Sequence, residues 1–108
     1  MASSSAFVKQ LAAQLTMQLS VVDDGSLDSK VASIVTSLRR QIVDVRLGIR
    51  DYELSESKQG QQENMREVSE HLAVLRKDIL EASEYNIFSV IDVAQLTAYI
   101  DRITESLA

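Results

Sequence analysis

Apolar residues in the middle of the chain alternate at spacings of three and four positions, and no other sequence feature restricts the fold as strongly. They are Val31, Val35, Leu38, Ile42, Val45, Ile49 and Tyr52. Because an α-helix turns once in about 3.6 residues, this spacing places them all on one helical face. The pattern predicts a helix from about Leu27 to about Ser57, which would be roughly 45 Å long.

Three other segments carry the same rhythm. Their apolar residues are Val8, Ala12, Leu15, Leu19 and Val22 in the first, Met65, Val68, Leu72, Leu75, Ile79 and Ala82 in the second, and Val93, Leu96, Ile100, Ile103 and Leu107 in the third. Proline is absent and glycine occurs three times, so few residues oppose helix formation. The expected fold class is all-α: an antiparallel helical bundle of about four heptad-patterned helices, one of them long.

The length of 108 residues suits one hydrophobic core, so we expect a single helical-bundle domain over residues 1–108. Asp23–Ser26 forms a turn signal in which Gly25 is free to take a left-handed conformation. Ser55–Asn64 contains no apolar residue. We therefore predict that the long helix ends there, that a loop surrounds Gly60, and that a new helix follows.

Residues 85–91 are apolar on all sides and rich in β-branched residues, which lowers helix propensity and admits a short strand. We favour a helix break, with Asn86 as a C-terminal residue and Ser89 with Asp92 as an approximate capping box. However, the apolar frames before and after this segment are in register. A single bent helix is therefore the alternative.

Charge and composition exclude several classes of function. A net charge of −5 disfavours nucleic acid, whose binding proteins need basic surfaces, and it disfavours anionic membranes. No apolar run approaches the ~20 residues that cross a bilayer. Met1–Ala6 lacks the features of a secretory signal, so we expect a cytoplasmic protein. A transit peptide is a weaker alternative, since Lys9 is the first basic residue and Lys30 the next.

The sequence offers few groups for chemistry. Cysteine is absent, and Glu67 with the only histidine, His71, does not form the Glu-x-x-His spacing of di-metal bundles, so we predict no metal, no cofactor and no enzyme activity. Histidine phosphotransfer domains are four-helix bundles whose histidine lies in a His-x-x-Lys-Gly setting. Val74 and Leu75 stand at the lysine and glycine positions here. Phosphorelay through His71 is therefore the alternative function.

A second flank of the long helix combines arginine with apolar residues outside the main stripe. We predict that it binds a protein partner through Arg39, Val43, Arg46, Leu47 and Arg50. The competing interpretation is that another helix of the same chain covers Val43 and Leu47, which leaves the arginines to pair with Asp44, Asp51 and Glu53. Nothing in the sequence decides between the two.

These observations predict a non-enzymatic helical protein–protein interaction module, such as a regulator, an adaptor or a secretion-type chaperone. The partner itself is not identified by any residue pattern. The heptad patterns leave more apolar edge than one copy covers, so we also expect a homodimer through the second and third helices.

Overall fold

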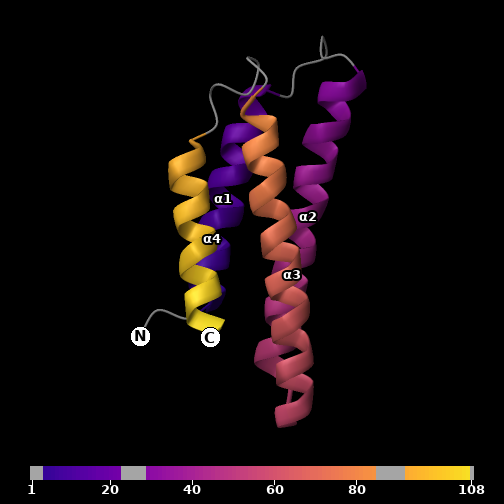
Figure 1. Ribbon diagram of the computed structural model, residues 1–108, viewed down its shortest axis with the longest axis vertical. Coiled ribbons are helices and arrows are strands. Elements are labelled where there is room, and N and C mark those ends of the chain that lie inside the picture. The colour runs from indigo at the N-terminus through magenta and orange to yellow at the C-terminus, as the bar shows by residue number, and fades with distance from the viewer. Residues whose placement is uncertain (1–3, 23–28, 85–91, 108) are drawn as a thin grey trace.

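The computed structural model describes residues 4–22, 29–84 and 92–107, and these residues form an all-α bundle (Figure 1). The helices are α1 (Ser4–Val22), α2 (Ser29–Leu54), α3 (Lys58–Ala82) and α4 (Val93–Leu107). None of the described residues lies in a strand. The predicted fold class, an antiparallel bundle of four helices, is therefore confirmed.

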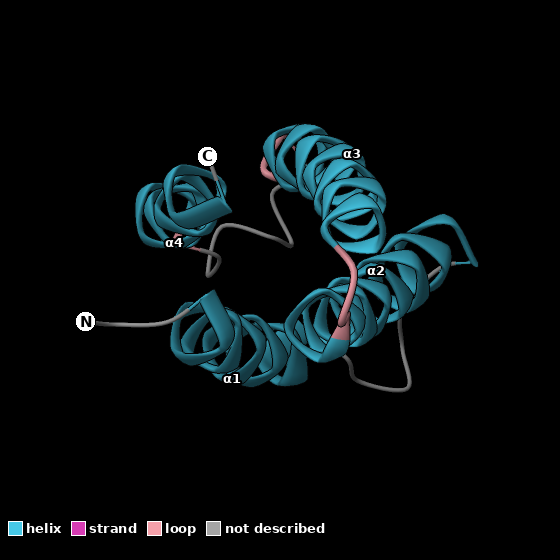
Figure 2. Ribbon diagram, turned by 90° about the horizontal axis from the view of Figure 1, so that it is seen from below, coloured by secondary structure: helices cyan, strands magenta, loops and turns pink. Residues whose placement is uncertain are grey.

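Each helix packs antiparallel to its neighbours in sequence (Figure 1), and α4 lies beside α1 (Figure 2). Gln41 of α2 hydrogen bonds to Asp78 of α3 at 2.6 Å, so the first half of α2 lies beside the second half of α3. Arg76 of α3 forms an ion pair of 3.4 Å with Asp101 of α4. α2 and α3 share the most extensive contact.

The four heptad stripes form one hydrophobic core. Its buried members are Val8, Leu11, Ala12, Leu15, Leu19, Val35, Leu38, Ile42, Val45, Ile49, Val68, Leu72, Leu75, Ile79, Ala82, Leu96, Ile100, Ile103 and Leu107. Tyr52, Met65 and Val93 stand at ends of their stripes and are only partly buried. The spacing of apolar residues thus identified the core face of every helix, because amphipathic helices bury that face against one another.

The connection between α2 and α3 is shorter than the sequence predicted. α2 ends at Leu54, and Ser57 caps α3 by accepting a hydrogen bond of 3.0 Å from the backbone N–H of Gly60. The predicted loop around Gly60 is wrong, since Gly60 lies in the first turn of α3. These polar turns project past the ends of α1 and α4 (Figure 1), so they need no apolar face.

The helix lengths also differ from the expectation of one long helix. α2 contains 26 residues and is about 39 Å long, and α3 is nearly as long with 25 residues. Both are longer than α1 and α4, which contain 19 and 15 residues. The molecule is therefore elongated, with extents of 48 × 24 × 18 Å, and the α2–α3 hairpin extends past α1 and α4 at one end (Figure 1).

Ser57→Ala is expected to lower the free energy of unfolding by about 1 kcal/mol, because the N–H of Gly60 loses its acceptor. Chemical denaturation measures the change. Ser57→Asp is the control, since aspartate also caps helices and should retain most of the stability. Equal losses in both variants would contradict the capping role.

α3 and α4 are separate helices, so the alternative of one bent helix is wrong. α3 ends at Ala82, with Ser83 as its C-cap. Asp92 caps α4, because its Oδ1 accepts a hydrogen bond of 3.0 Å from the backbone N–H of Gln95. The roles predicted for Asn86 and Ser89, and the strand alternative, fall at 85–91, outside the described residues. The same holds for the turn at 23–28.

Gln18 joins α1 to the start of α4. Its Nε2 donates to Oε1 of Gln95 at 2.9 Å, and its Oε1 accepts from the backbone N–H of Asp92 at 2.7 Å. One amide therefore satisfies a backbone donor at a helix N-terminus and bridges two helices. This contact sets where α4 begins along α1.

Candidate functional site

Four of the five predicted partner-binding residues line one groove between α1 and α2. Val43, Arg46, Leu47 and Arg50 form its α2 side, together with the buried Ile49 and with Glu53, while Val8 and Lys9 form its α1 side. The groove has a volume of about 370 Å³. Arg39 is half-buried on the same helix and does not line this groove.

α1 covers Val43 and Leu47 only in part. Val43 is 49% exposed and Leu47 is 44% exposed, although both lie beside a neighbouring helix. On α1, Val8 and Lys9 line the groove beside Val43 and Leu47. Farther along the junction, beside Arg46, the short residues Ala12, Ala13 and Thr16 line a second hollow with Lys9 and Met17.

The surface is basic although the chain as a whole is acidic. α1 carries one lysine and no acidic residue, and α1 and α2 together hold six basic and three acidic residues, a net charge of +3. α3 and α4 together hold five basic and seven acidic residues, a net charge of −2. Three of these basic residues, Lys9, Arg46 and Arg50, line the groove between the two helices together with one acidic residue, Glu53.

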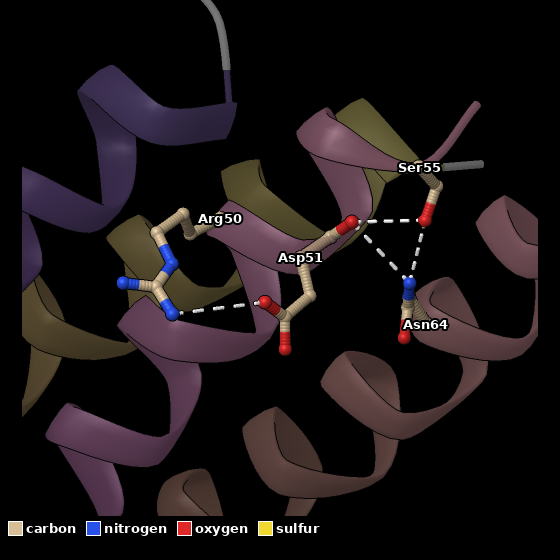
Figure 3. A network of polar contacts seen from close by, with 4 residues as sticks. All are labelled: Arg50, Asp51, Ser55 and Asn64. Carbon is tan, nitrogen blue, oxygen red and sulfur yellow. Dashed lines mark hydrogen bonds and ion pairs between the residues drawn. The ribbon is translucent and has the colours of Figure 1, made fainter.

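The cations of this groove have weak partners or none within the described ranges. Arg50 lies 3.9 Å from Asp51 in a pair exposed to solvent (Figure 3), and such pairs contribute at most about 1 kcal/mol. Lys9 and Arg46 form no side-chain hydrogen bond or ion pair with any described residue. Charged groups in this state can bind an incoming anion without first breaking a strong contact.

The end of α2 that carries Arg50 is held firmly. The amide of Asn64 donates to Oγ of Ser55 at 2.7 Å and to the backbone oxygen of Asp51 at 3.3 Å, and Oγ of Ser55 donates to that same oxygen at 2.9 Å (Figure 3). These bonds satisfy a carbonyl at the C-terminal end of α2 and tie it to α3. Arg50 extends from the other side of α2.

The structure reveals an exposed stripe on α2 that our sequence analysis missed in part. Arg40, Val43, Leu47, Arg50 and Leu54 follow one another at spacings of three, four, three and four. Leu54 is 70% exposed and extends the apolar flank toward the tip of the hairpin. We call these five residues the outer stripe. Its spacing was present in the sequence, whereas the contribution of Lys9 and Met17 depends on how α1 is turned, which no sequence pattern indicated.

His71 lies apart from this groove, exposed on α3. Glu67, one turn before it, is also exposed, Val74 is 52% exposed, and Leu75 is buried in the core. Within residues 4–22, 29–84 and 92–107, no three histidine, aspartate or glutamate side chains lie close enough to hold a metal ion. His71 is therefore an exposed residue of α3, outside the α1–α2 groove.

A second hollow, of about 360 Å³, lies between α2 and α3 beside Lys30, Ser37 and Asp78. Gln41 spans the adjoining seam, since its Nε2 donates to Oδ2 of Asp78 at 2.6 Å and to Oγ of Ser37 at 3.0 Å. The bond to Asp78 crosses the helix pair, whereas the bond to Ser37 lies within α2. Among the described residues, Oε1 of Gln41 is buried without a hydrogen-bond partner.

Comparison with protein-family models, with curated proteins and with solved structures found no significant match for this chain. Among the helices that the structure describes, none combines the length and the apolar character needed to cross a membrane.

Proposed function

We propose that this protein is a non-enzymatic interaction module that binds a protein partner through Arg39, Val43, Arg46, Leu47 and Arg50. The observation that carries the proposal is the half-exposure of Val43 and Leu47 beside cations in an open groove. Regulators, adaptors and secretion-type chaperones act in this way, and we propose that the protein works in the cytoplasm.

The residue types support binding. Arginine combines a planar charged group that bonds through several N–H donors with an aliphatic stem, and it is enriched in protein interfaces. Contiguous exposed apolar patches with a polar rim mark interaction sites. Arg46 lies between the two hollows that line the α1–α2 junction, so it is the cation most central to the surface.

The test combines Val43→Ser with Arg46→Glu and measures both stability and the recovery of co-purifying protein from the native source. We expect an unchanged melting temperature, because both side chains lie outside the core, and loss of the co-purifying partner. The matched control is Val74→Ser with Lys77→Glu, which makes the same valine-to-serine change and the same reversal of charge at exposed positions of α3. Unfolding of the first variant, or equal loss of partner in both, would refute the proposal.

We also propose self-association through α2 and α3. The support is that these helices extend past α1 and α4 (Figure 1), where Tyr52 and Met65 are only partly buried. A second copy would cover them. We expect light scattering to give twice the monomer mass of 12.0 kDa at micromolar concentration. A strict monomer would rule out this part of the proposal.

The alternative, phosphorelay through His71, is tested with a small-molecule phosphodonor such as acetyl phosphate. We expect no acid-labile phosphate on the protein, because Val74 and Leu75 replace the lysine and glycine of the phosphotransfer setting. We also expect His71→Gln to leave partner recovery unchanged. Labelling that His71→Gln abolishes would favour the phosphorelay.

A further inference from the structure

The α1–α2 groove has the charge and shape that suit one kind of occupant, and we infer that it binds an acidic amphipathic helix from a different protein. This inference rests on the proposed function, because it names the chemistry of the partner at the same surface. It also extends the surface beyond the flank, to Lys9 and Met17 on α1 and to Leu54 on α2.

The shape of the surface suits a helix lying along α2. Val43 and Leu54, the first and last apolar residues of the outer stripe, are eleven positions apart, which is about 16 Å or three turns, and Leu47 lies between them. A helix with apolar residues at i, i+4, i+7 and i+11 presents a matching stripe over the same length. The short side chains of Ala12 and Ala13 leave a hollow along α1 where the apolar side chains of that helix can lie.

The charges specify the sign of the partner. Lys9, Arg46 and Arg50 line the groove, and Glu53 is the one acidic residue among its lining residues. Carboxylates flanking the apolar stripe of the bound helix would pair with the arginines through charge-assisted hydrogen bonds. A basic helix would be repelled by Lys9, Arg46 and Arg50, so the surface selects its partner by charge as well as by shape.

A second copy of the chain is a poor occupant for this groove. If the outer stripes of two copies packed on each other, Arg40 and Arg50 of both copies would lie in one interface and repel one another. The stripe contains no acidic residue that could pair with them. The exposed apolar residues of α3, Val74 and Leu80, are six positions apart and point to different sides of the helix. No described helix of this chain therefore offers an acidic face with a continuous exposed apolar stripe.

The experiment uses three synthetic peptides of about 18 residues, each labelled with a fluorophore. The first places leucine at i, i+4, i+7 and i+11 with glutamate at the flanking positions. The second keeps the leucines and replaces glutamate with lysine. The third keeps the composition of the first and scrambles the leucine positions. Fluorescence anisotropy with the full-length protein at low and at physiological salt gives the three affinities.

We expect the acidic amphipathic peptide to bind at least about tenfold more tightly than either control, and to weaken as salt is raised. Arg46→Glu with Arg50→Glu should reverse the preference toward the lysine peptide. Val43→Ser with Leu47→Ser should remove binding of the acidic peptide and of the lysine peptide. The melting temperature of each variant is measured alongside, and Val74→Ser with Lys77→Glu serves as the folded control that retains the wild-type preference.

Three results would overturn the inference. The first is equal affinity for the acidic and lysine peptides, or no binding of the acidic one. The second is tighter binding of a single-stranded oligonucleotide than of the acidic peptide. The third is conversion of a dimer to a monomer by Leu47→Ser, which would show that a second copy occupies the groove. If the peptide fails but Val43→Ser with Arg46→Glu still abolishes recovery of the native partner, the proposed function stands and only the partner chemistry is wrong.

Discussion

Leu75→Ala is expected to lower the free energy of unfolding by about 2–5 kcal/mol, and Leu38→Ala by a similar amount. Both leucines are fully buried, at central positions of the stripes on α3 and α2. Truncation removes apolar area from the core and leaves a cavity, because the surrounding helices are held by their other contacts and collapse only in part. For a domain with a total stability of about 5–15 kcal/mol, this is a large share.

Urea denaturation followed by circular dichroism measures both losses. Val74→Ala is the control for Leu75, since it truncates the adjacent residue of the same helix at an exposed position. We expect the control to change the stability by less than about 1 kcal/mol. Losses below about 1 kcal/mol for both leucines would mean that the core lies elsewhere.

Gly48→Ala is expected to destabilise the protein by about 1–3 kcal/mol, although alanine favours helices more than glycine does. Gly48 of α2 faces Val68 of α3. A Cβ added there would lie 2.7 Å from Cγ2 of Val68, well inside normal van der Waals contact. Val68 is fully buried and stiff at χ1, so its methyl group has little room to move.

A double-mutant cycle isolates this contact. Val68→Ala alone should destabilise the protein because it opens a cavity, but in the Gly48→Ala background it also removes the clash. The double variant should therefore lose less stability than the two single losses combined. Simple additivity, or a stabilised Gly48→Ala variant, would show that the α2–α3 approach is looser than the structure indicates.

The core was predictable because a helix repeats its faces at a fixed angle per residue. A stripe such as that of Leu38, Ile42, Val45 and Ile49 identifies both the secondary structure and the buried side of the helix. Turn positions were less predictable. Gly60 and the polar run around it were interpreted as a loop, but a capping serine three positions earlier is enough to start a helix where nothing has to be buried.

The candidate site was predictable in part. Val43 and Leu47 stood out because they are apolar at positions outside the core stripe of their own helix. Whether another helix covers them depends on the size of the side chains that the neighbouring helix turns toward them. α1 places Val8 and Lys9 beside them and the short Ala12, Ala13 and Thr16 beside Arg46, and no local pattern in α1 indicates which of its flanks faces α2.

By itself, the sequence determined that this chain forms amphipathic helices and which face of each is buried, because those properties depend on residues three and four positions apart. The tertiary structure decided what depends on residues far apart in the chain. Gln18, a polar residue outside the apolar stripe of its helix, bridges to Asp92 and Gln95, 74 and 77 residues away. In the same way, the basic groove exists only because α1 and α2 pack side by side with short side chains on one edge and arginines on the other.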